Sequence, residues 1–180
     1  MRRNKRPIPI IAFPIIPFII AGESGRTIVS VGRGEADVGE AREVMDRLTD
    51  AILKGDSEAL RALYAQDAVA ETPDQGTITG RDQIAAYFCE FSAAFPGNAW
   101  EERYKHEIGD TAIDEGYIVG TNTGSMTGPN GETIPATGRR VRFRECDVAT
   151  VKSGVVTSHR IYFDVQDWLT QLGFAPESPV

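Results

Sequence analysis

The chain has 180 residues, of which 41% are hydrophobic and 25% are charged, and its formal net charge is −7. This length and this apolar share fit one domain with a real core plus a tail. Residues 1–36 hold six basic and two acidic residues, which leaves a charge of −11 on residues 37–180. Because so acidic a body repels phosphate backbones, we expect no nucleic-acid partner.

The chain contains few cysteines and histidines. Its two cysteines, Cys89 and Cys146, give little signal for a structural disulfide. Its two histidines, His106 and His159, form no spacing typical of metal ligands with them. We therefore expect no metal site.

The first residues combine a basic start with an apolar stretch that runs to Ala21. This order is typical of a signal peptide, but four prolines interrupt any helix there, and a membrane span needs about 20 apolar residues. An export signal, a disordered tail and upstream sequence outside the native product all remain open, and we favour the last two. We expect a tail at residues 1–36, a domain at residues 37–175 and no stable membrane span. The expected location is the cytoplasm, or outside the cell if the segment is a functional signal peptide.

The first half of the domain has helical periodicity. Apolar residues recur at helical spacing in residues 41–54, and Gly55 follows as a stop signal. Asp56 is a suitable N-cap for a second helix at residues 57–64. A short strand at residues 68–71 and a third helix at residues 83–95 complete this half.

After Pro96 the pattern changes to that of strands separated by hairpin turns. We expect the strands at residues 100–108, 112–123, 139–151 and 155–163, with turns at 109–110, 129–131 and 153–154. A short amphipathic helix follows at residues 165–174. This order predicts an α+β fold in which helices pack on one face of a curved antiparallel sheet and enclose a pocket.

Several short segments, in this order and at this spacing, carry a family resemblance. They are LYAQDAV at residues 63–69, GTITGRDQI at 76–84, GTNTG at 120–124, ATGRRV at 136–141, YFD at 162–164 and QLG at 171–173. Over roughly residues 40–174 the chain resembles the SnoaL-like polyketide cyclases, within the nuclear-transport-factor-2-like superfamily. The resemblance implies a cystatin-like cone, a homodimer, a cavity for a hydrophobic small molecule and no cofactor.

The resemblance also implies a catalytic residue. Cyclases of this family use a carboxylate as acid and base in an aldol closure, and Asp164 matches that position. The family motif commonly reads Gly-Thr-His-Thr-Gly, whereas this chain has Asn122, an amide that cannot exchange a proton near neutral pH. The position that carries the base in ketosteroid isomerases of the same fold matches Thr72, which is not a carboxylate either.

Asp164 stands where a hydrophobic strand ends and a helix begins. Catalysis requires that an apolar setting raises its pKa, whereas Asp at this position also suits an N-cap. His159 is the second catalytic candidate, or else a core residue. Strand alternation puts His159 on one face and Tyr162 with Asp164 on the other.

Five further residues are candidates for ligand binding, each with a structural alternative. Tyr162 and Asn122 could orient a substrate oxygen, or pack as an aromatic and hold a close strand approach. Arg144 could bind an anionic group, although a basic strand is more often solvated or paired across strands with acidic residues such as Glu101. Trp100 and Phe88 are expected to line the core or the pocket.

These observations predict a cofactor-free acid/base enzyme, a cyclase or isomerase, that acts on a hydrophobic carbonyl compound. The first alternative is a non-catalytic small-molecule-binding or dimerisation module of the same fold. The second is an epoxide hydrolase of the limonene type, for which the surroundings of Arg142, Arg144 and Asp147 are the candidate Asp–Arg–Asp set.

Overall fold

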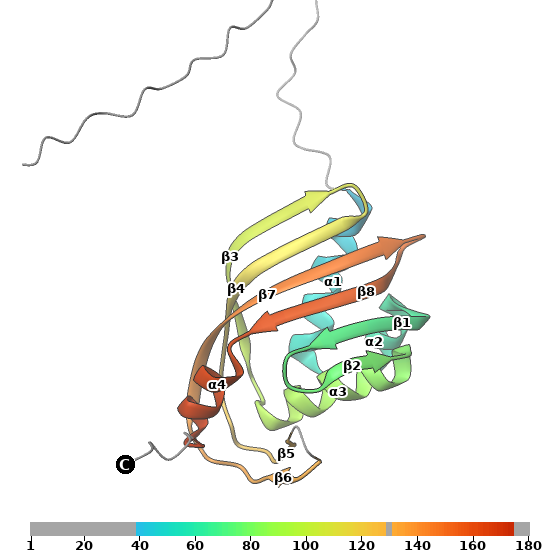
Figure 1. Ribbon diagram of the computed structural model, residues 1–180. Helices are drawn as coiled ribbons and strands as arrows, with labels where there is room; N and C mark the ends of the chain where they lie inside the picture. The colour runs from blue at the N-terminus through green and yellow to red at the C-terminus, as the bar shows by residue number, and fades with distance from the viewer. Residues whose placement is uncertain (1–38, 129–130, 175–180) are drawn as a thin grey trace, which may run out of the picture. The chain divides into compact units, whose positions relative to one another are not determined.

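A six-stranded sheet with helices packed against one face forms the body of the protein (Figure 1). It is seen in a computed structural model that describes residues 39–128 and 131–174, which belong to one compact unit, Ala36–Val180. The expected tail at residues 1–36, and Pro129 and Asn130 of the expected turn, lie outside the described residues.

The four helices of the described chain lie close to the expected positions. They are α1 (Glu40–Lys54), α2 (Ser57–Leu63), α3 (Arg81–Ala94) and α4 (Val165–Leu172). Gly55 ends α1 in the left-handed conformation, with φ of 62°, where a side chain would be strained. The Asp56 side chain caps α2 by accepting a hydrogen bond from the Ala59 N–H. No helix in the described ranges is long and apolar enough to cross a membrane.

The main sheet has the strand order β2-β1-β8-β7-β4-β3. Its strands are β1 (Tyr64–Thr72), β2 (Gly76–Thr79), β3 (Ala99–Ile108), β4 (Thr111–Thr121), β7 (Arg140–Lys152) and β8 (Val155–Phe163), and a separate pair is formed by β5 (Met126–Thr127) and β6 (Thr133–Ile134). The α+β fold is confirmed. The sheet is antiparallel, as expected, through β3, β4, β7 and β8, whereas β1 joins β8 in parallel. The short strands β2, β5 and β6 were not predicted, because two to four residues give almost no period.

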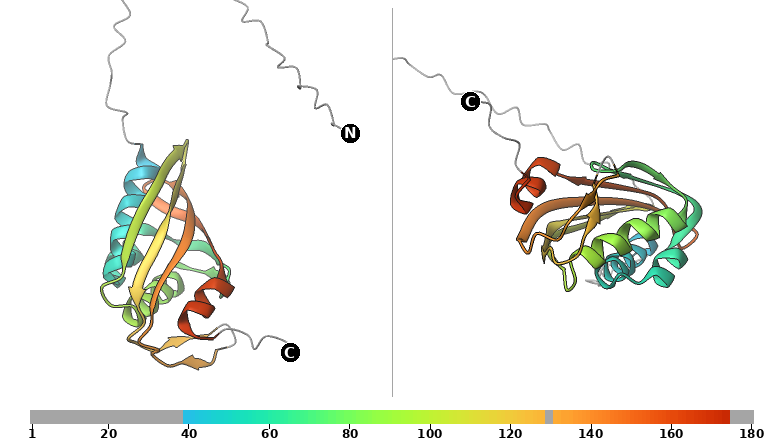
Figure 2. Two further views of the ribbon diagram at one scale, coloured as in Figure 1. Left: turned by 90° about the vertical axis from the view of Figure 1, so that its left-hand side faces the viewer. Right: turned by 90° about the horizontal axis from the view of Figure 1, so that it is seen from below.

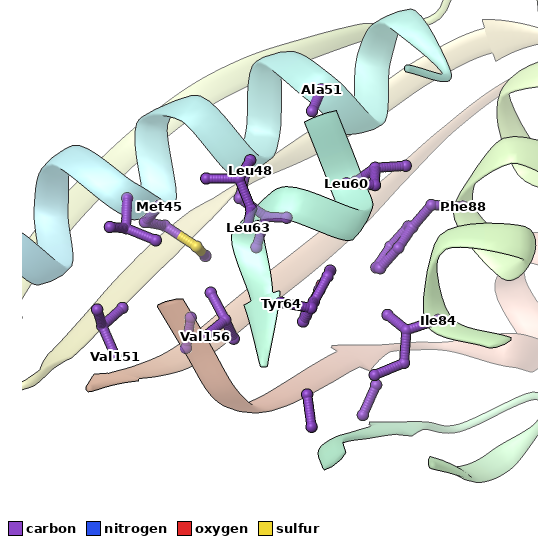
Figure 3. Close-up of a cluster of buried hydrophobic side chains, with 14 of the residues drawn as sticks. Met45, Leu48, Ala51, Leu60, Leu63, Tyr64, Ile84, Phe88, Val151 and Val156 are labelled. Atoms are coloured by element: carbon purple, nitrogen blue, oxygen red, sulfur yellow. The ribbon is translucent and has the colours of Figure 1, made fainter. Parts of the chain in front are cut away.

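Helices α1, α2 and α3 cover one face of the sheet, which curves around them (Figure 2). We call this the inner face and the opposite one the outer face. The main core lies between these helices and strands β1, β7 and β8 (Figure 3). Its members include Met45, Leu48, Leu60, Tyr64, Ile84, Phe88, Val151 and Val156. A second cluster, which includes Phe95, Phe143, Trp168 and Leu172, packs α4 against the end of β7.

Candidate functional site

Strand alternation divides the predicted site between the two faces of the sheet. On β8 the His159 and Ile161 side chains point inward and are buried, whereas Tyr162 is 54% exposed on the outer face. On β7, Glu145 and Asp147 continue the inward series that begins with Val141 and Phe143, as their pairing with β8 requires. The inner face therefore carries Asp147, which the sequence suggested only as a member of an Asp–Arg–Asp set, and Glu145, which the sequence did not suggest as a site residue.

A small hollow lies between the inner face and the helices, and Glu145 lines it. Its other lining residues are all apolar or aromatic: Ile52, Tyr87, Phe88, Phe91, Ile118, Phe143, Ile161 and Phe163. We call this space the inner hollow. Its volume is about 30 Å³, which is room for about one water molecule. Of the predicted ligand residues, Phe88 lies here, as expected for a pocket-lining aromatic.

The surroundings of Glu145 disfavour its ionised form. Burial raises the pKa of its carboxyl well above 4.5, and the charge of Asp147, a hydrogen bond with Asp147 and the charge of Asp74 raise it further. A proton on Glu145 is therefore held far more firmly than on an exposed glutamate. The direction of this change is the one that a carboxyl acting as general acid or base near neutral pH requires.

A chain of buried hydrogen bonds leads away from this carboxyl pair. The Tyr64 hydroxyl lies 2.6 Å from His159 Nδ1, and His159 Nε2 lies 3.2 Å from Asp147 Oδ1. Burial and the charge of Asp147 raise the pKa of Tyr64 well above 10, so the hydroxyl keeps its proton; it donates to Nδ1 or accepts from it according to the tautomer of His159. The other ring nitrogen, Nε2, faces the carboxylate of Asp147. His159 is thus a member of the interior polar network, although it lines none of the hollows described here.

A buried ion pair lies next to this network. Arg42 on α1 donates hydrogen bonds to both carboxylate oxygens of Asp114 on β4, and also to Asp46. Burial raises the pKa of Asp114, because the loss of hydration outweighs the opposing effect of Arg42. The expected Asp–Arg–Asp set does not form around Asp147, since Arg142 and Arg144 point to the outer face.

Asp164 lies on the other side of the sheet and is exposed. It caps α4, and its Oδ1 accepts a hydrogen bond from the Asp167 N–H at 3.0 Å. The expectation that Asp164 is sheltered from water is wrong for the single chain, because the carboxylate serves the exposed start of a helix. Its catalytic role stays a prediction.

Asp164 nevertheless shares a hollow with two other predicted residues, Tyr162 and Arg144. This outer hollow has a volume of about 520 Å³, and Glu115, Glu145, Cys146 and Phe163 complete its lining. Arg144 is exposed and its Nη2 lies 2.7 Å from Glu115, so its charge is paired across strands. The predicted site residues therefore form two groups, one inside and one outside.

The two remaining predicted residues have structural roles. Asn122 is fully buried, and its amide nitrogen donates to the carbonyl oxygens of Ala94 and Gly124. Its Oδ1 accepts from the N–H and the hydroxyl of Thr137, which uses the hydrogen-bonding capacity of the side chain. Trp100 packs over Gly116, where an added Cβ would lie 2.6 Å from the indole ring.

A groove larger than the inner hollow opens between α3, β2 and β5, and we call it the α3 groove. Its volume is about 480 Å³, and it is lined by Asp74, Gln75, Thr77, Ile78, Thr79, Gln83, Ala86, Tyr87, Glu90, Phe91, Met126 and Thr127. Tyr87 and Phe91 also line the inner hollow, so they form the wall between the two spaces. The Tyr87 hydroxyl donates to Asp74 Oδ1 at 3.1 Å, which holds this wall in place.

The fold and this interior define a class: an α+β cone with a polar group inside an aromatic cavity. The family model of the SnoaL-like polyketide cyclases matches residues 42–172, and the chain belongs to this family. No curated protein matches the chain by sequence comparison.

Solved structures share the fold. A protein from Jannaschia sp. CCS1 assigned to the SnoaL-like polyketide cyclases superimposes with a TM-score of 0.68 at 18% identity, over 81% of this chain and 100% of that one. A protein from Catenulispora acidiphila DSM 44928 with a ketosteroid isomerase-like fold gives 0.59 at 21% identity, over 76% and 98%. An LEH-like epoxide hydrolase of M. tuberculosis gives 0.57 at 22% identity, over 74% and 89%.

Proposed function

We propose that the protein is an acid/base enzyme that acts on a hydrophobic carbonyl compound, with Glu145 as the group that takes and returns a proton. The observation that carries this proposal is the position of Glu145, a carboxyl of raised pKa in the lining of an otherwise apolar and aromatic hollow. Raised basicity lets its ionised form abstract a proton from a carbon next to a carbonyl group.

The enolate then reacts in one of two ways, and protonated Glu145 completes either reaction. The enolate either attacks a second carbonyl group of the substrate, which closes a ring, or is protonated at another carbon, which isomerises the substrate. In either case protonated Glu145 returns the proton. Asp147, which hydrogen-bonds Glu145, and the His159–Tyr64 pair behind it are positioning residues that hold this carboxyl inside the sheet.

We propose that the substrate enters from the α3 groove. The inner hollow alone is far smaller than a site for a bicyclic compound, whereas the groove has a volume of about 480 Å³. Tyr87 and Phe91 separate the two spaces, and rotation of Tyr87 requires the loss of its hydrogen bond to Asp74. Side-chain rotation at this wall joins groove and hollow into one site that ends at Glu145.

Asp164 is the competing base, because it matches the family's catalytic carboxylate and lies with Tyr162 and Arg144 in the outer hollow. We also propose that a second copy of the chain covers the outer face, where Tyr104, Ile108 and Tyr162 are 60%, 73% and 54% exposed. Such a homodimer would shield Asp164 from water. Light scattering during size-exclusion chromatography checks the dimer, and a monomeric mass at all concentrations contradicts it.

The experiment that tests the function follows proton exchange directly. The full chain is incubated with 2-tetralone in D₂O, and loss of the α-proton signals is measured by NMR. We expect Glu145→Gln to slow the exchange about 100- to 10,000-fold, the range for loss of a general base, and Asp164→Asn to leave it unchanged. Equal melting temperatures of the variants and the wild type serve as the folding control.

The opposite results select the alternatives. If Asp164→Asn abolishes exchange and Glu145→Gln does not, the outer hollow is the active site. If the wild-type protein binds 2-tetralone but exchanges no faster than Glu145→Gln, the chain is a binding module without this chemistry.

A further inference from the structure

We infer that the α3 groove binds a ligand that carries a positively charged amine on an apolar body. This inference rests on the proposed function, since it names the class of substrate that the same site takes. It is carried by the charges and the apolar and aromatic surface of the groove lining.

The charged residues of the groove lining all have one sign. Asp74 and Glu90 are acidic, and none of the described residues that line the groove is a lysine, arginine or histidine. The other polar residues of the lining are neutral amides and hydroxyls, namely Gln75, Thr77, Thr79, Gln83 and Thr127. A carboxylate or phosphate in the groove would therefore meet two like charges and no counter-ion, whereas an ammonium group would meet two partners.

Both carboxylates are fixed in place by hydrogen bonds. Asp74 accepts from the Tyr87 hydroxyl at 3.1 Å, and Glu90 accepts from the Thr127 backbone N–H across the groove. Each carboxylate keeps further lone pairs for a ligand, since an ionised carboxylate has about four acceptor sites. The charges are thus already oriented before a ligand arrives.

The rest of the lining suits an apolar body with a cationic end. Ile78, Ala86 and Met126 supply aliphatic surface, and the rings of Tyr87 and Phe91 supply aromatic faces. An ammonium group over an aromatic ring is attracted by the ring quadrupole. Apolar surface, aromatic rings and fixed carboxylates together distinguish this groove from a solvated acidic patch.

The negative field of the groove reaches the proposed base. Burial is the main cause of the raised pKa of both Tyr87 and Glu145, and the charge of Asp74 raises each of them further. A bound cation next to Asp74 opposes this effect, so it favours the ionised form of Glu145 that abstracts the proton. Binding of an amine and activation of the base are therefore coupled in the same direction.

The test compares three probes that share one bicyclic ring: 2-naphthylmethylamine, 2-naphthylmethanol and 2-naphthoate. Isothermal titration calorimetry on the full chain at low ionic strength measures their dissociation constants. We expect the order amine, alcohol, carboxylate from tightest to weakest, with about a tenfold step between amine and alcohol, the size expected for two partly solvated charges. The step should shrink at high salt.

The variant pair Asp74→Asn with Glu90→Gln removes both charges but keeps both acceptors for Tyr87 and Thr127. We expect it to weaken the amine about tenfold and to leave the alcohol unchanged. The matched control is Glu43→Gln with Glu58→Gln, which changes the net charge equally at exposed positions on α1 and α2 outside the groove lining. It should leave all three probes unchanged.

Three results overturn the inference: equal affinity for amine and alcohol, tighter binding of the carboxylate, or an equal effect of the groove pair and the control pair. The outcome is separable from that of the proposed function. Amine selectivity that depends on the groove pair stands even if Glu145→Gln exchanges protons as fast as the wild type, and its absence leaves the exchange experiment unaffected.

Discussion

The inner and outer faces of β7 differ in how each treats charge, although their residues alternate along one strand. The outer face carries Arg142 and Arg144, which reach Glu101 and Glu115 through exposed ion pairs. The inner face carries Glu145 and Asp147, which no arginine or lysine contacts through a hydrogen bond in the described chain. Glu145 lies among aromatic residues, and Asp147 faces His159. Exposed charges keep their hydration and contribute little to the stability of the fold. A carboxyl inside the protein without a basic partner lowers that stability, so its presence points to a function.

The largest expected difference between the faces comes from neighbouring residues on β4. Asp114→Ala leaves the buried Arg42 charge without its bidentate partner, and we expect it to lower the free energy of unfolding by about 3–5 kcal/mol. Glu115→Ala, one residue away on the outer face, should leave it nearly unchanged. Urea unfolding followed by circular dichroism measures both, and equal effects would contradict the contrast.

A tyrosine on each face gives the second comparison. Tyr64→Phe removes the hydroxyl that bonds His159 Nδ1 and leaves a buried ring nitrogen unpaired, at a cost of about 1–3 kcal/mol in unfolding free energy. Tyr162→Phe on the outer face should have no measurable effect. If the two variants unfold at the same urea concentration, the buried hydrogen bond does not contribute to stability.

The pH dependence of stability is a third way to separate the faces. The folded pKa of Glu145 lies above its ordinary value of 4.5, so between the two values the folded state binds more protons than the unfolded state. The contribution of Glu145 is therefore fully present below pH 4.5 and is lost as pH rises through the folded pKa, at about 1.4 kcal/mol for each pH unit between the two pKa values. Glu145→Gln should remove this decline, and Glu115→Gln should retain it. Urea midpoints over a pH series measure the difference between the variants.

Removing the helix cap on the outer face should change the unfolding free energy less than the inner-face variants above. Asp164→Ala removes the acceptor for the Asp167 N–H and should lower the unfolding free energy by about 1 kcal/mol. Asp164→Asn keeps an acceptor and should restore most of the loss. A larger loss in both variants would indicate that the Asp164 charge has a partner, such as a second copy on this face.

The smallest effect is expected at Arg144. Its side chain is 68% exposed and, within the described part of the chain, forms an ion pair with Glu115 alone, so Arg144→Ala should leave the unfolding midpoint within experimental error. A clear loss of stability that depends on protein concentration would instead place Arg144 in a subunit interface.

Much of the fold could be predicted from sequence because its signals are local. The helical spacing before Gly55, the Asp56 cap and the change of period after Pro96 placed most helices and long strands within a few residues of their positions. Alternation on β8 also separated His159 from Tyr162 correctly. The match of Asp164 to a helix start was equally local, and the structure has it as the cap of α4.

The interior site could not be predicted in the same way, because it depends on pairing between distant segments. His159 meets Tyr64 only because β1 joins β8 in parallel, and the two residues are 95 positions apart in the chain. One local signal was available. Glu145 and Asp147 continue the inward series of Val141 and Phe143, but the arginines that alternate with this series dominate the pattern of the strand.

Asn122 stands at the position where the family motif commonly has a titratable histidine, and its role here is to form hydrogen bonds within the protein. Its four hydrogen bonds tie the end of α3 to Gly124 and Thr137, and β5 and β6 lie between these two residues. The Asn122 side chain thus holds the two ends of the segment that contains β5 and β6, and these hydrogen bonds give it a structural role. Met126 and Thr127, which line the α3 groove, belong to a segment that Asn122 fixes to the rest of the fold, so we expect substitutions in this segment to change ligand choice while the sheet stays intact.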